Sequence, residues 1–125
     1  MLTAAAVLVC VLDLIGRALP PIVLLDVRPA DVSPNAEAFV RRNPDIIYLL
    51  TTTEVFADAR RQQYQALRKL ASILVHEEWH LRHGADERAA YHAQLRELLR
   101  LGETPERRNY RGVLRALRLV TNGTL

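Results

Sequence analysis

Cysteine is almost absent from this chain of 125 residues, which contains only Cys10. A single cysteine excludes an internal disulfide and argues against a structural zinc site built from several thiolates. Long hydrophobic runs are also absent, since no apolar stretch reaches the roughly 20 residues that a membrane-spanning helix needs. We therefore expect one domain, residues 1–125, that is held together by a modest hydrophobic core.

Dense charge and abundant aromatic residues are lacking too. The formal net charge is +3, and aromatic residues make up 6% of the chain. The basic residues are mostly arginines spread along predicted helices, without the dense basic run and interleaved aromatics typical of a nucleic-acid surface. With 50% hydrophobic and 25% charged residues, the composition is that of a globular protein, and we expect no nucleic-acid partner.

Residues 1–20 admit two interpretations. Leu2–Leu12 is apolar enough to resemble the core of a signal peptide, which would make the protein secreted. However, no basic residue precedes this run, Asp13 interrupts it, and the sequence before Pro20 is a weak cleavage site. We therefore expect a core helix that ends near Gly16, and a cytoplasmic protein rather than a secreted one.

Two short runs predict β-strands. Ile22–Val27 is β-branched and bounded by prolines, and Ile46–Leu50 follows a turn at Asn43–Asp45. Between the two strands, Ala36–Arg42 is expected to form a helical turn. The sequence identifies no third strand, although a sheet of three strands would be more stable than one of two.

Helices dominate the second half of the chain. Thr51–Glu54 matches a capping box, and Ala57–Ala66 should lead into a long helix that Gly84 ends with a left-handed cap. A further helix should open at Asp86 or the residue before it, and a basic one should span residues 104–120. The predicted class is α+β and mostly helical, with a short sheet before the long helix and helices after it.

The long helix carries the one pattern that specifies a chemistry. It reads His76-Glu77-Glu78-Trp79-His80 and matches the H-E-x-x-H motif of zinc hydrolases. Residues four apart on a helix lie about 40° apart around its axis, so the two histidines can direct their imidazoles at one metal ion. Glu77 lies beside them, where its carboxylate can take a proton from a water molecule at the metal.

The surroundings of the motif favour a metal site over an amphipathic helix with incidental histidines. Ile73–Val75 points in three directions around the helix, so this segment should be buried on nearly all sides. Polar residues recur only on the side that holds Lys69, Glu77 and the two histidines. A solvated helix face does not explain a buried helix with one polar stripe. Trp79 is expected to pack in the core beneath the site.

A catalytic zinc site needs a third protein ligand, and three residues just beyond the motif are candidates. His83 lies on the same helical face as the two motif histidines, but three ligands on one straight helix spread over about 10 Å. His83 is therefore expected to cap the helix or to support a ligand. The turn at Gly84 lets the chain fold back, so Asp86 or Glu87 could approach the metal from another direction.

A resemblance to the gluzincin family of zinc metallopeptidases rests on three features: His76-Glu77-x-x-His80, a glycine turn, and Glu87-x-x-Ala90 at the start of the next helix. The size of the chain and the strands before the motif are similar to the smallest members, the minigluzincins. The resemblance implies a zincin-like domain in which His76, His80 and Glu87 bind Zn²⁺ and Glu77 is the general base. It also implies hydrolysis of a peptide or protein substrate.

Two further features have alternative interpretations. Tyr91 lies four residues beyond Glu87 on the same helical face, so its hydroxyl could hydrogen-bond the oxyanion that develops during hydrolysis. The alternative is a packing tyrosine with its hydroxyl at the surface. The basic helix over residues 104–120 is interpreted by default as a solvated face, with a lid over the cleft or a site for an acidic partner as alternatives.

Two hypotheses of function follow. The first is a zinc-dependent metallopeptidase. The second is a catalytically silent or latent zincin-like module that binds metal or a protein partner. Structural zinc prefers four protein ligands, frequently cysteines, and the single cysteine of this chain argues against the second hypothesis.

Overall fold

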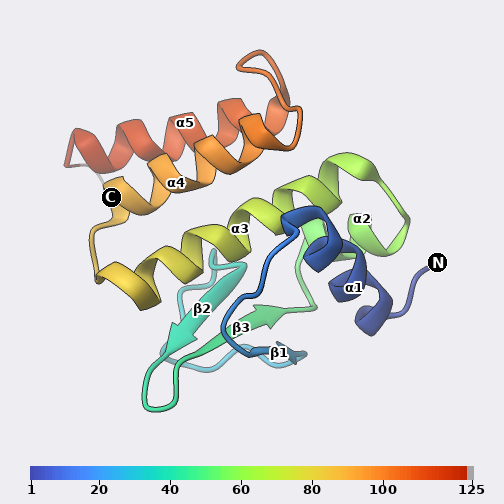
Figure 1. Ribbon diagram of the computed structural model, residues 1–125. Helices are drawn as coiled ribbons and strands as arrows, with labels where there is room; N and C mark the ends of the chain where they lie inside the picture. The colour runs from blue at the N-terminus through green and yellow to red at the C-terminus, as the bar shows by residue number, and fades with distance from the viewer. Residues whose placement is uncertain (124–125) are drawn as a thin grey trace.

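The fold places one long helix, α3, between a small sheet and a pair of helices (Figure 1). The computed structural model describes residues 1–123, so the last two residues of the predicted domain lie outside the described part. In chain order the elements are α1 (Ala4–Ile15), β1 (Ile22–Leu25), β2 (Ala38–Arg41), β3 (Ile46–Leu50), α2 (Glu54–Arg60), α3 (Tyr64–His83), α4 (Glu87–Arg100) and α5 (Arg108–Thr121). This order confirms the predicted α+β class, with the sheet before the long helix and further helices after it.

The sheet has the strand order β1-β3-β2, with β1 parallel and β2 antiparallel to the central strand β3. The predicted strand Ile46–Leu50 is β3, and the first predicted strand ends at Leu25 instead of Val27. The helical turn predicted at Ala36–Arg42 is wrong, because four of its residues form β2.

Partners distant in sequence make β2 a strand. Phe39 lies opposite Tyr48, and their rings stack with centroids 5.0 Å apart. The Leu50 N–H donates to the Glu37 carbonyl at 3.1 Å and extends the pairing beyond β2 itself. Such cross-strand contacts outweigh the weak local preference of a four-residue segment.

The predicted continuous helix from Ala57 into α3 is also wrong. Gln62 takes a left-handed conformation with φ of 63°, which ends α2 and lets α3 begin at Tyr64 in a new direction. The N-cap of α2 is Thr53, two residues after the predicted Thr51, and its hydroxyl accepts from the Phe56 N–H at 3.3 Å. A left-handed residue other than glycine is uncommon, and the residue type gave no sign of it.

The outer helices begin and end at identifiable caps. The Thr3 hydroxyl accepts from the Ala6 N–H at 3.1 Å to start α1, and Gly16, with φ of 74°, ends it. The basic C-terminal helix α5 begins at Arg108 and not at Thr104, because residues 104–107 form a turn closed by a 2.9 Å bond from the Arg107 N–H to the Thr104 carbonyl.

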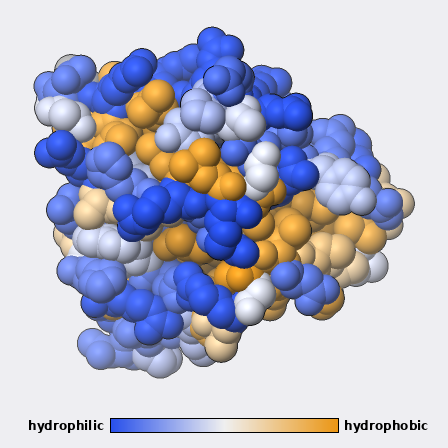
Figure 2. Space-filling view, turned by 45° about the horizontal axis from the view of Figure 1, so that its top comes forward, coloured by the Kyte–Doolittle hydropathy of each residue, from blue (hydrophilic) through white to orange (hydrophobic). Residues whose placement is uncertain are grey.

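The apolar side chains form two clusters. The larger one joins α1, α2, α3 and the sheet, and Leu70 and Leu74 of α3 are fully buried in it. The smaller one joins α4 and α5 through Leu95, Leu98 and two residues of α5. Figure 2 shows hydrophobic residues gathered at the end of the molecule that carries α1. None of the described helices is both long and apolar enough to cross a membrane.

Candidate metal centre

The last two turns of α3 bring His76 and His80 to the same side of the helix. His76 is buried and His80 is half-buried. Gly84 then ends the helix with φ of 109° and ψ of −154°, and its N–H donates to the His80 carbonyl at 2.9 Å. Its φ is positive as predicted, but its ψ lies outside the left-handed helical region, in one that only glycine adopts readily. This sharp turn reverses the chain directly after the second histidine.

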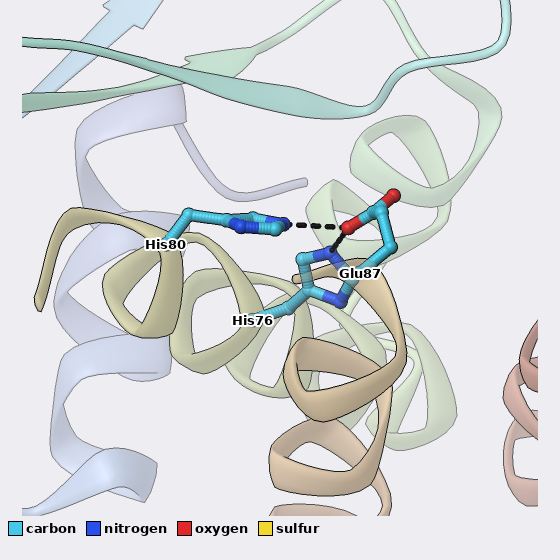
Figure 3. Close-up of side chains that lie close together, drawn as sticks. All are labelled: His76, His80 and Glu87. Atoms are coloured by element: carbon cyan, nitrogen blue, oxygen red, sulfur yellow. Dashed lines mark hydrogen bonds and ion pairs between the residues drawn. The ribbon is translucent and has the colours of Figure 1, made fainter. Parts of the chain in front are cut away.

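The start of α4 separates the roles of the two candidate acids. Asp86 is the N-cap, and its Oδ1 accepts from the Ala89 N–H at 3.2 Å. Glu87 is the first residue of the helix, and its Oε1 lies 2.8 Å from His76 Nε2 and 2.5 Å from His80 Nε2 (Figure 3). Of the two acids left open by the sequence, the structure therefore turns Glu87 toward the histidines.

His76, His80 and Glu87 form a cluster that could hold a metal ion, with ligand atoms within 4.8 Å of one another. His83, the remaining candidate, is exposed and lies against Trp79, with ring centroids 4.9 Å apart. Trp79 is partly buried and packs against the main core, and its ring is 5.9 Å from that of His80. His83 thus lies outside the cluster of His76, His80 and Glu87.

A chain of hydrogen bonds fixes the tautomer of His76. The Ser72 hydroxyl donates to the Lys69 carbonyl at 2.7 Å, since a carbonyl can only accept. Ser72 then accepts from the Gln94 amide nitrogen at 3.2 Å, which turns the Gln94 oxygen toward His76 Nδ1, 2.9 Å away. The proton of a neutral His76 therefore resides on Nδ1, and the Nε2 lone pair points at Glu87.

His80 is fixed in the same way by a simpler contact. Its Nδ1 lies 2.8 Å from the Gly84 carbonyl oxygen, which accepts the Nδ1 proton. Histidines that bind metal through one nitrogen usually donate the other N–H to such an acceptor. Both rings are held in the orientation and tautomer that a metal ligand needs.

The chemistry of the donor set fits a divalent metal ion. Two Nε2 lone pairs and a carboxylate oxygen converge on one region, and they repel one another unless a proton or a cation lies among them. Two imidazoles and one carboxylate form one of the common ligand sets of catalytic zinc, and other transition metal ions accept the same donors.

The carboxyl groups of the site are shifted in opposite directions. When no metal ion is bound and the Nε2 atoms carry protons, hydrogen bonds from His76 and His80 lower the pKa of Glu87 to about 2, so Glu87 is a carboxylate at neutral pH. Burial raises the pKa of Glu77 to about 7, although the charges of the two histidines act to lower it. A carboxyl with a pKa close to neutral can both take and return a proton.

Tyr91 lies one turn after Glu87 and contacts His76 edge-on, with ring centroids 4.6 Å apart. The side chain is half-buried and lines the same cleft as Glu77. Burial is the main cause that raises the pKa of its hydroxyl, and the negative charges of Glu87 and Glu77 raise it further. The hydroxyl therefore keeps its proton at neutral pH. Tyr91 therefore has both the ring packing expected of a packing tyrosine and the cleft position expected of a hydrogen-bond donor to the oxyanion.

A cleft of about 1040 Å³ surrounds these residues. Its floor is the polar side of α3, and its walls come from the start of β2, from α2, from the first turns of α4 and from α5. Lys69 Nζ, on α3, lies 3.5 Å from Glu37 Oε2, just before β2. This ion pair joins the floor of the cleft to the wall at the start of β2.

Comparison with protein-family models, curated proteins and solved structures found no match for this chain.

Glu78, the residue after the candidate base, has a different role. It is 4% exposed, and its two carboxylate oxygens accept from Arg17 at 2.6 and 2.7 Å and from Arg82 at 2.9 Å. Burial alone would raise its pKa, but these hydrogen bonds bring the pKa below its ordinary value. Glu78 thereby ties the segment after α1 to α3, on a side of the helix away from His76 and His80.

Sequence reasoning missed Ser72 and Gln94, both of which are buried. Ser72 lies one turn before His76, and Gln94 lies two turns after Glu87, so both occupy helix faces that already carry a ligand. A search for polar residues at helical spacing from the candidate ligands could have found them.

Proposed function

We propose that this protein is a zinc-dependent metallopeptidase, in which His76, His80 and Glu87 bind Zn²⁺ and Glu77 is the general base. The observation that carries the proposal is the position of a partly buried carboxyl, Glu77, in a cleft beside three convergent potential metal-ligand atoms. Two imidazoles, one carboxylate and an adjacent protonatable acid constitute the machinery that metal-assisted hydrolysis requires.

Each residue has a defined task in this mechanism. Zinc, when bound, would lower the pKa of a water molecule and polarise a peptide carbonyl. Glu77 takes the proton of the attacking water, and it returns a proton to the amine nitrogen as the carbon–nitrogen bond breaks. Tyr91 is the candidate donor to the oxyanion, because its protonated hydroxyl belongs to a ring held edge-on by His76.

The free edge of β2 is the proposed support for the substrate backbone. Within the described residues β2 pairs with β3 alone, and the cleft is lined by its first residue, Ala38, and by Glu37 just before it. An extended peptide can add to such an edge as a further strand, which gives main-chain binding without dependence on side chains. The central strand β3 cannot take this role, because both of its edges are paired.

Metal analysis and a pair of matched variants test the proposal. Purified protein should contain about one zinc ion per chain, and His80→Ala should lose it. Glu77→Gln should keep the zinc and lose hydrolysis of a broad peptide library, because the amide cannot take a proton. Glu54→Gln is the control, since Glu54 lines the same cleft outside the metal cluster, and it should keep the activity.

Two results would overturn the proposal. Unchanged hydrolysis in Glu77→Gln would remove the general base from the mechanism. A zinc-loaded parent protein that cleaves no peptide would instead favour the silent or latent metal-binding module.

A further inference from the structure

Helix α5 forms one wall of the cleft and is held there by its apolar side. Val113 and Leu117 are buried against Leu95 and Leu98 of α4. The two helices run side by side in opposite directions (Figure 1), so α5 returns past α4 toward the end that carries Glu87. The orientation of α5 is thereby fixed, and so is the set of side chains that it presents to the cleft.

The cleft side of α5 carries Arg108, Arg111 and Arg115, which line the cleft together with Gly112 and Ala116. We call these five residues the α5 wall. The spacing of three and four residues aligns the arginines in one stripe along the helix. All three are exposed, and the other residues of α5 that line the cleft, Asn109 and Val113 among them, are uncharged. The charged side chains that α5 presents to the cleft are therefore all arginines.

The arginines of the α5 wall have no carboxylate partner in the described part of the chain. The ion pairs of that part use other basic residues, among them Arg61 with Asp58 and Lys69 with Glu37. The acids Asp58 and Glu37 line the same cleft, but each is already paired with a basic residue. Two further acids line the cleft outside the metal centre, Glu54 at the start of α2 and Glu106 before α5. Neither forms an ion pair with the arginines of the α5 wall in the described part of the chain.

Gly112 gives a second reason to expect a ligand at this wall. Glycine inside a helix costs about 1 kcal/mol relative to alanine. Neither a positive φ nor crowding requires it here, because an added Cβ would meet nothing within 4 Å. A glycine between arginines on a cleft wall leaves room for another chain to approach the helix backbone closely.

We propose that the α5 wall binds acidic side chains of the substrate, so that the cleft takes peptides with glutamate or aspartate at alternate positions. This inference rests on the proposed peptidase function of the same cleft. Arginines three and four residues apart are separated by roughly 4.5 and 6 Å along the helix axis. Alternate residues of an extended peptide are separated by roughly 6.6 Å and point to one side, a match that long arginine side chains can complete.

A nucleic acid fits this cleft less well than an acidic peptide. Its phosphates repeat along the whole backbone, so some would come close to the acids Glu37, Glu54 and Asp58, which line the same cleft. Tyr91 is the one Phe, Tyr or Trp side chain among the lining residues of the described chain, and single strands are usually held on several such stacking rings. An acidic peptide can direct its carboxylates to the α5 wall alone.

The test measures peptide binding to the zinc-loaded Glu77→Gln protein by isothermal titration calorimetry. The probes are three ten-residue peptides that differ only in carrying Glu, Gln or Lys at alternate positions. The Glu peptide should bind roughly tenfold more tightly than the Gln peptide, given three exposed charge pairs, and raised salt should reduce the difference. The Lys peptide should bind most weakly.

Two triple variants in the same background assign the effect to the α5 wall. R108Q/R111Q/R115Q should remove the preference for the Glu peptide. R96Q/R107Q/R118Q removes the same charge from exposed arginines that do not line the cleft, and it should keep the preference. Equal loss in both variants would overturn the inference, because net charge alone would then explain the binding.

Other outcomes also decide the matter. Equal affinity for the Glu and Gln peptides would overturn the inference, and so would tighter binding of a ten-residue single-stranded oligonucleotide. Hydrolysis by the parent protein is scored separately. Cleavage without a charge preference would remove this inference and leave the peptidase, whereas acid-selective binding without cleavage would remove the peptidase and leave the acidic ligand.

Discussion

The amide oxygen of Gln94 lies 2.9 Å from His76 Nδ1 and holds the proton of that ring away from the metal cluster. Gln94 is itself oriented by Ser72, so a backbone carbonyl of α3 determines, through two side chains, which nitrogen of His76 faces Glu87. If a metal ion binds here, Gln94 should therefore control how well His76 serves as a ligand without touching the metal itself.

Gln94→Leu should weaken zinc binding by roughly 10- to 100-fold, because His76 loses the acceptor that fixes its tautomer. Competition titration with a chromophoric chelator measures the Kd. Gln63→Leu, at an exposed position that lines the same cleft, should leave the Kd unchanged. If Gln94→Leu bound zinc as the parent does, packing against Tyr91 would be enough to orient the ring.

Asp86 and Glu87 should respond to alanine in opposite ways. Asp86→Ala removes an N-cap and should lower the free energy of unfolding by about 1 kcal/mol while zinc binding is kept. Glu87→Ala removes the oxygen that faces both histidines and should abolish the rise in Tm on adding zinc. For the parent, ligand linkage predicts about 4 kcal/mol of stabilisation when free zinc is 1,000 times the Kd.

Thermal unfolding with and without zinc measures both effects. Loss of the zinc-dependent rise in Asp86→Ala, with its retention in Glu87→Ala, would reverse the assignment of the third ligand.

Two glycine substitutions should also have opposite signs. Gly84→Ala forces a side chain into a backbone region that disfavours it, and it should cost roughly 1–3 kcal/mol and weaken zinc binding. Gly112→Ala is open and helical, and it should stabilise the fold by up to about 1 kcal/mol. Urea unfolding compares the two variants. A harmless Gly84→Ala would show that the turn after α3 can relax without moving Glu87.

The contribution of Glu78 to stability should depend on pH. Arg17 and Arg82 lower its pKa in the folded protein below the ordinary value of 4.5, although burial acts in the other direction. A lowered folded pKa means that the stabilisation is present above pH 4.5 and is lost as the pH falls through the folded value. With a chelator present, Glu78→Gln should cost about 1–3 kcal/mol at pH 7 and clearly less at pH 3. A cost that does not change with pH would mean that packing, and not charge, is lost.

The sequence was sufficient where the decisive contacts are local. The positions of His76 and His80 follow from helical spacing, and β3 follows from its own run of β-branched and aromatic residues. Glu87 and Asp86 could not be separated from sequence, because they differ by one position after a turn whose angles depend on Gly84. The hydrogen bond from the Ala89 N–H to Asp86 separates their roles, because it engages the Asp86 carboxylate as the N-cap of α4.

The errors fall where distant contacts decide the structure. Strand β2 depends on Phe39 meeting Tyr48, and the break at Gln62 depends on how α2 and α3 pack. Neither requirement is visible in a short window of residues. The partnership of Gln94 with His76 joins two helices, so it needed the angle between α3 and α4 as well as the spacing within each.

The turn at Gly84 has a consequence for the order of folding. It keeps His76 and Glu87 only 11 positions apart, whereas Arg17 reaches Glu78 across 61 positions and Arg100 reaches Leu14 across 86. Closing a short loop costs less chain entropy than closing a long one, so zinc should clamp the α3–α4 hairpin before α1 docks. Pulsed hydrogen exchange during refolding with zinc should protect this hairpin first. The metal would then act as a nucleus around which the two ends of the chain assemble.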